Sequence, residues 1–189
     1  MQYTAECSPR GILGWLSVRK PEAAIFVFGA VLRLSMGWNY HPRWSYDTDF
    51  HWEVVTWIAK HAKVPSPETV FEAFHPPLYY VLAAGLTNLG VSRTGMAWFS
   101  ITTSILELGV IWAGLELYLT HSRVARVTAL ALAATTSALI HLGGMVYSES
   151  LNCLLNAVVL LLVPLVFRRQ GGARWLPAMG LGSFSASPC

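Results

Sequence analysis

The chain has 189 residues, of which 54% are hydrophobic and only 12% are charged, and its formal net charge at pH 7 is +3. Soluble domains carry roughly 25% charged residues, so this composition indicates an integral membrane protein. The basic residues sit in short flanks and not in one patch, which excludes nucleic acid as a partner. The three cysteines, Cys7, Cys153 and Cys189, are too far apart in sequence for a metal or disulfide motif.

Four apolar segments predict transmembrane helices. A spanning helix needs about 20 predominantly apolar residues, and four segments reach or approach this length: 23–38, 96–119, 124–146 and 151–167. Basic residues precede the first segment, separate the second from the third, and follow the fourth. Because positively charged flanks favour the cytoplasmic side, we expect an all-α, multi-pass membrane protein with about four transmembrane helices and both termini in the cytoplasm.

The large external loop, about residues 39–95, is predicted to contain two helices that lie on the membrane surface. In the first, 50–62, apolar residues at 50, 54, 57, 58 and 62 form the stripe of an amphipathic helix. Thr48 or Asp49 is its expected N-cap. The second segment, 77–90, opens with proline and has only 14 residues, which is too short to span the membrane.

This loop also carries the residues best suited to chemistry. Asp47 and Asp49 lie two positions apart, close to His51. Such acids can act as a general base toward a hydroxyl or bind a divalent cation; the alternative is that they only cap a helix and face water. His75 precedes the run Pro-Pro-Leu-Tyr-Tyr, which would hold an imidazole and two phenols at the headgroup level. The alternative for this run is an aromatic belt that anchors the helix.

Two ionisable residues fall inside predicted spans. Arg33 lies in the first span, and we expect its long side chain to snorkel toward the outer surface. Glu107 lies near the middle of the second span, where an ionised carboxylate is costly, so we expect a protonated or hydrogen-bonded structural role. The loop is therefore the expected place of chemistry, which disfavours a transporter with its site at the midplane.

The order of these motifs resembles the first external loop of the GT-C glycosyltransferases. An acidic pair after the first span, an amphipathic helix and then His-Pro-Pro-Leu-Tyr-Tyr are similar to family 39 glycosyltransferases, protein O-mannosyltransferases and aminoarabinose transferases. Tyr147-Ser-Glu149-Ser resembles their second loop, and the resemblance covers about residues 23–167. The chain departs from the family pattern in two ways. It has Asp-Thr-Asp where Asp-Glu is commoner, and it corresponds only to the N-terminal part of such an enzyme.

The resemblance implies sugar transfer from a polyprenyl-phosphate donor at the outer or luminal face, with Asp47 or Asp49 as the catalytic base. An acid on an interfacial helix would lie at the height of the lipid phosphate, and the leaving phosphate needs cationic or hydrogen-bonding partners. The expected substrate-binding residues are Arg43, His51, His75, Tyr79 and Glu149. The resemblance leaves open a divalent cation, with Asp49 as its ligand.

Several alternatives stay open. Residues 1–170 are expected to form the N-terminal part of a GT-C-like transmembrane domain, whereas 171–189 have no assigned structure and fit either a flexible end or a truncated or misread gene. The chain would be a glycosyltransferase, or a non-catalytic subunit or inactive fragment with the same fold. The bilayer and the lipid-linked sugar are the expected partners, and the acceptor is open. The membrane would be a bacterial inner membrane or the endoplasmic reticulum.

Overall fold

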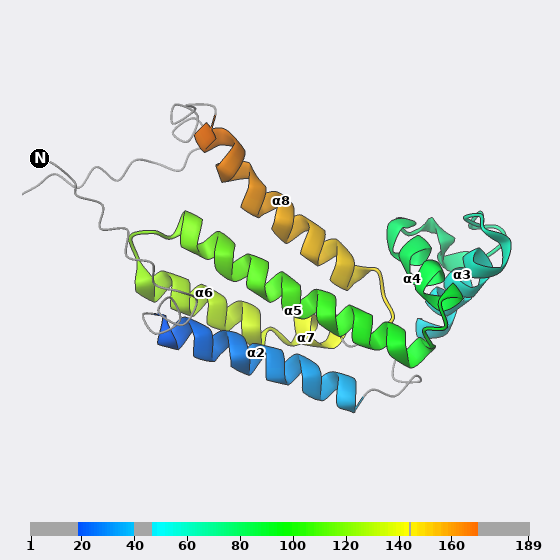
Figure 1. The fold of residues 1–189 in the computed structure, drawn as a ribbon, viewed down its shortest axis with the longest axis horizontal. Coiled ribbons are helices and arrows are strands. Elements are labelled where there is room, and N and C mark those ends of the chain that lie inside the picture. The colour runs from blue at the N-terminus through cyan, green and yellow to red at the C-terminus, as the bar shows by residue number, and fades with distance from the viewer. Residues whose placement is uncertain (1–18, 40–46, 144, 170–189) are drawn as a thin grey trace, which may run out of the picture.

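The computed structural model describes residues 19–39, 47–143 and 145–169, and this part of the chain is entirely helical. Figure 1 shows a bundle of long helices with a smaller group of short helices at one end. The bundle consists of α2 (Lys20–Trp38), α5 (Arg93–Tyr118), α6 (Arg123–Thr135), α7 (Ser137–Gly143) and α8 (Glu149–Arg169). The short helices, which we call the lobe, are α3 (Thr48–His61), the 3₁₀ helix η1 (Phe71–Phe74) and α4 (Leu78–Asn88).

Within the bundle, α5 is the central helix and contacts α2, α6, α7 and α8. Gly29 allows α2 to approach closely, because a Cβ at that position would lie 2.8 Å from Leu108 Cδ2 and 2.9 Å from Ala134 Cβ. Small residues at such crossings let helix backbones pack together. The ends of α2, α5 and α6 away from the lobe are joined by ion pairs: Arg19 and Arg126 pair with Glu116, and Arg123 pairs with Glu22.

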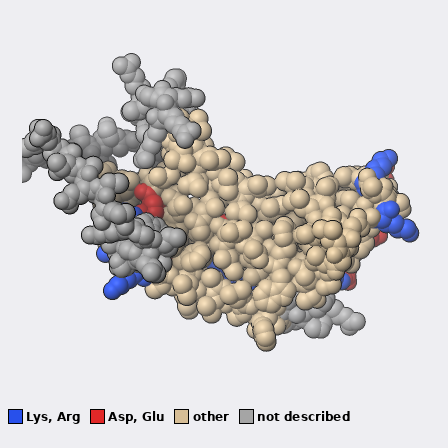
Figure 2. Space-filling view, viewed as in Figure 1, with Lys and Arg blue, Asp and Glu red and all other residues tan. Residues whose placement is uncertain are grey.

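Two of the described helices, Arg93–Tyr118 and Glu149–Val166, are long and apolar enough to cross a membrane. They correspond to the second and fourth predicted spans. The first predicted span is also helical and forms most of α2, a helix that carries Lys20, Glu22 and Arg33. On the face drawn in Figure 2, charged atoms gather at the two ends of the molecule and the surface between them is almost entirely uncharged.

The prediction of one continuous helix over 124–146 is wrong. The chain leaves the helical conformation at Thr136, where φ is −59° and ψ is 113°, and α7 begins at the next residue. The hydroxyls of Thr135 and Thr136 donate to the carbonyl oxygens of Ala131 and Leu132 at 2.8 and 2.6 Å. Consecutive threonines that bond to their own helix in this way weaken and bend it.

The prediction that Arg33 snorkels is also wrong. Its side chain is 1% exposed and is surrounded by protein. The guanidinium donates to Ser104 Oγ at 2.9 Å, and to the carbonyl oxygens of Ala134 and Ala133 at 3.2 and 3.3 Å. Glu107, the other ionisable residue of the predicted spans, is also buried and interacts electrostatically with Arg33. Hydrogen bonds inside the bundle therefore replace solvation of the Arg33 guanidinium at the surface.

In the lobe, both predicted helices form, but the buried face of α3 packs on protein. Val54, Val55 and Ile58 lie in one apolar core with α4 and the start of α5. Of the predicted stripe, positions 54 and 58 are buried, whereas Phe50 and Ala62 are exposed. The predicted N-cap is off by one or two residues: Asp47 occupies the N-cap position and makes no side-chain capping bond.

Candidate functional site

A cavity of about 430 Å³ lies where the lobe meets the segment that connects α7 to α8. Its lining carries three carboxylates, two imidazoles and four aromatic rings: Asp47, Phe50, His51, Phe71, Glu72, Phe74, His75, Tyr147 and Glu149. These residues come from α3, η1 and the turn before α8, which are far apart in the sequence. The cavity is therefore built by tertiary packing of both predicted external loops.

At the start of α3, the two aspartates of the Asp-Thr-Asp motif point in different directions. Asp47 lines the cavity, and its carbonyl oxygen accepts a hydrogen bond from the backbone of His51, one turn further on, at 3.1 Å. Asp49 does not line the cavity; its carboxylate is 73% exposed and forms an ion pair with Arg93 at 2.6 Å. Residues two positions apart on a helix face different sides, so only one acid of the pair reaches the site.

His51 is held at the back of the cavity by α4. Its Nδ1 lies 2.6 Å from the hydroxyl of Tyr80, and its ring centroid lies 4.7 Å from that of Tyr147. Burial, assisted by His75, lowers the pKa of His51 to about 4, although Asp47 opposes the shift. The imidazole is therefore neutral at physiological pH. Burial, followed by the carboxylates of Glu72 and Glu149, raises the pKa of Tyr80, so its phenol stays protonated.

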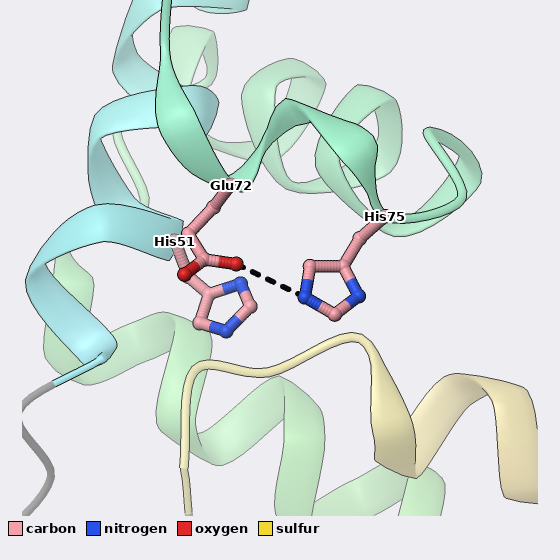
Figure 3. A group of neighbouring side chains, drawn as sticks. All are labelled: His51, Glu72 and His75. Carbon is pink, nitrogen blue, oxygen red and sulfur yellow. Dashed lines mark ion pairs between the residues drawn. The ribbon is translucent and has the colours of Figure 1, made fainter. Parts of the chain in front are cut away.

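Glu72 and His75 form the opposite wall. Glu72 Oε2 lies 3.0 Å from His75 Nε2, and the two residues are three positions apart across η1. Glu72 is buried, whereas His75 is partly open to the cavity. Figure 3 shows both side chains pointing toward His51, which comes from α3. His51, Glu72 and His75 each offer one ligand atom, and these atoms lie within 4.8 Å of one another, so this trio could hold a metal ion.

Of the three other predicted site residues, only Glu149 is observed at the cavity formed by the described residues. Glu149 lines the cavity, and its Oε2 is buried without a hydrogen-bond partner in the described part of the chain. Tyr79 lies in the core of the lobe, where its ring centroid is 6.4 Å from that of Phe99, and does not line the cavity. Arg43 lies outside the described residues.

Sequence reasoning did not assign Glu72 or Tyr80 to the site. For Glu72 a signal existed: a carboxylate three residues before a histidine puts both on one face of a single helical turn. For Tyr80, the sequence contains two adjacent tyrosines and does not indicate which of them contacts His51. The orientation in which α4 packs places the second one there.

No protein-family model, curated protein or solved structure matches the chain.

Proposed function

We propose that the chain forms the first-loop catalytic region of a membrane glycosyltransferase that takes a sugar from a polyprenyl-phosphate donor. One observation carries the proposal: a single cavity contains Asp47, the N-cap residue of α3, and Glu149, the first residue of α8, together with a lining of aromatic rings. Carboxylates accept hydrogen bonds from sugar hydroxyls and aromatic faces pack on sugar rings, so a cavity with both kinds of group suits a glycosyl substrate.

The distribution of apolar surface supports a four-span arrangement. In this arrangement α2, α5, the α6–α7 pair and α8 cross the bilayer, with the lobe on the outer side and the ion pairs of Glu22 and Glu116 on the cytoplasmic side. The uncharged band between the two ends of the molecule fits the hydrocarbon layer (Figure 2). Leu78, Val81 and Leu82 form an exposed apolar stripe on α4, which suits contact with the interface.

In the proposed reaction Asp47 is the base. It accepts the proton of the acceptor hydroxyl while the acceptor oxygen forms a bond to the anomeric carbon. The bond from that carbon to the lipid phosphate breaks, and its electron pair leaves with the phosphate. His75, which is partly open to the cavity, can donate a hydrogen bond to the departing oxygen. Glu149 would orient the sugar through its hydroxyls, because this carboxylate also lines the cavity.

The test is sugar transfer from a polyprenyl-phosphate donor by the purified protein in detergent. Asp47→Asn keeps the shape of the side chain and removes the base, and loss of a general base typically slows a reaction by about 10²- to 10⁴-fold. We expect that loss with donor binding retained. Glu68→Gln, an exposed change in the same lobe, is the matched control and should keep its activity.

Asp49→Asn separates the two acids of the pair. Because Asp49 pairs with Arg93 and does not line the cavity, we expect a smaller effect than at Asp47. Wild-type rates in Asp47→Asn would refute the assignment of the base. Donor binding without transfer in the unmodified protein would favour the alternative of a non-catalytic subunit.

A further inference from the structure

Three side chains of the lobe converge, and the proposed transfer reaction gives a role to only one of them, His75. His51 comes from α3, Glu72 from η1, and His75 from the residue that ends η1. One ligand atom of each lies within 4.8 Å of the other two. The three side chains point toward one another in Figure 3. Two imidazoles and one carboxylate are the donor set of many zinc sites that keep an open coordination position.

The spacing of the ligand atoms is close to what a metal requires. Zinc binds imidazole nitrogen and carboxylate oxygen at about 2.0–2.2 Å, so neighbouring ligands in a tetrahedral site lie roughly 3.4 Å apart. Glu72 Oε2 and His75 Nε2 are separated by 3.0 Å, already near this spacing. The remaining distances of up to 4.8 Å must shorten by as much as roughly 1.4 Å to reach the tetrahedral spacing, and side-chain rotation can supply this change.

The surroundings of His51 are those of a metal ligand. Histidines that bind metal usually use their second ring nitrogen for a hydrogen bond that fixes the tautomer and the ring orientation. In His51, Nδ1 is 2.6 Å from the Tyr80 hydroxyl, and the two rings stack at an interplanar angle of 17°. A metal ion bound while this contact is kept would therefore take Nε2 of His51. Glu149 lines the same cavity and adds a carboxylate beside the trio, and its buried Oε2 has no hydrogen-bond partner among the described residues.

We propose that His51, Glu72 and His75 bind one divalent transition-metal ion, with Zn²⁺ as the first candidate and an open coordination position toward the cavity. Imidazole ligands favour zinc and its neighbours in the first transition row over Mg²⁺ and Ca²⁺, which prefer oxygen. The ion would tie α3 to the segment between η1 and α4. The inference does not depend on sugar transfer, because metal binding can be measured when no substrate is present.

The experiment uses the purified protein in detergent, stripped with a chelator and then titrated with Zn²⁺ and, separately, with Co²⁺ as a spectroscopic probe. We expect one ion per chain and Co²⁺ absorption typical of four-coordinate geometry. Loss of an outer partner costs about 10- to 100-fold in metal affinity. Tyr80→Phe should therefore lower the zinc affinity by about 10- to 100-fold. Glu72→Gln and His75→Gln should lower it by at least as much.

His61→Gln is the matched control, because His61 is an exposed histidine on the same helix whose Nδ1 lies 2.9 Å from the carbonyl oxygen of Trp57. It should bind zinc as the unmodified protein does. Zinc should raise the melting temperature of the unmodified protein and of His61→Gln, and leave that of Glu72→Gln unchanged. Absence of zinc binding to the unmodified protein would overturn the proposal. So would zinc affinities in Glu72→Gln and His75→Gln equal to that of the control.

Discussion

Arg33 illustrates what a single side chain contributes to this bundle. Its guanidinium reaches from α2 to the carbonyl oxygens of Ala133 and Ala134 in the last turn of α6. In an unbroken helix these oxygens would accept from the amides of Ser137 and Ala138, but those two residues lie in the first turn of α7. Arg33 thus supplies donors where the helix ends, and its positive charge suits the negative end of the helix dipole.

We predict that Arg33→Leu destabilises the protein. The substitution removes the donors and leaves buried carbonyl oxygens without them, and an unsatisfied buried polar group typically costs about 1–3 kcal/mol. Thermal unfolding in detergent, followed by circular dichroism, should show a lower melting temperature. Lys60→Ala, at an exposed position of α3, is the control and should change stability by no more than about 0.5 kcal/mol. Equal melting temperatures for the two variants would contradict this role of Arg33.

The sequence predicts side chains near a site better than it predicts their partners. Asp47, His51, His75 and Glu149 were all expected at the site and all line the cavity. The separation of Asp47 from Asp49 was not foreseen, because the start of α3 had to be known to within one residue. Glu72 meets His51 only because η1 packs against α3, a long-range contact that local spacing does not encode.

Among the elements, α3 and α4 pack against each other in an apolar core that also includes the start of α5 and Leu151 of α8. Ile58 is 7% exposed and lies in that core with Tyr80 and Ala84 of α4. The sequence predicted both helices, since an amphipathic stripe and an opening proline are local signals. It assigned the apolar face of α3 to the membrane, because a stripe alone does not tell whether lipid or protein covers it.

We predict that Ile58→Ala loosens the lobe. Truncation of a buried isoleucine typically costs about 2–5 kcal/mol, and here the loss falls on the contact between α3 and α4. Lys60 and Lys63 are exposed near the end of α3, so trypsin should cleave the variant there faster than the unmodified protein. Val64→Ala, at an exposed position in the same segment, should leave the cleavage rate unchanged. An unaltered rate of trypsin cleavage in Ile58→Ala would mean that the apolar face of α3 does not stabilise the packing of α3 on α4.

At the scale of the whole molecule, the two ends differ in character. The lobe lies at one end of the bundle (Figure 1). The cavity belongs to that end, and the ion pairs of Glu22 and Glu116 belong to the other. The sequence anticipated this polarity from its basic flanks. It missed the interruption at Thr136 because hydropathy averages over a window and does not register a change in backbone direction.

We predict that the two ends lie on opposite sides of the membrane. Cysteines introduced at Glu68, in the lobe, and at His121, in the turn between α5 and α6, are both at exposed positions. With Cys7, Cys153 and Cys189 replaced by serine, an impermeant thiol reagent should label Glu68→Cys from outside intact cells or sealed vesicles and His121→Cys only after permeabilisation. Labelling of both from the same side would exclude a crossing by α5.

The bond from Arg33 to α6 has a consequence for biosynthesis. During membrane insertion, α6 would reach the lipid with the carbonyl oxygens of its last turn exposed, and hydrocarbon offers them no donor. The donor that they use in the folded protein belongs to α2, about 100 residues earlier in the chain. In the proposed four-span arrangement, synthesis from the N-terminus would place the guanidinium in the bilayer before the carbonyls that need it, so the order of translation would match the order of assembly.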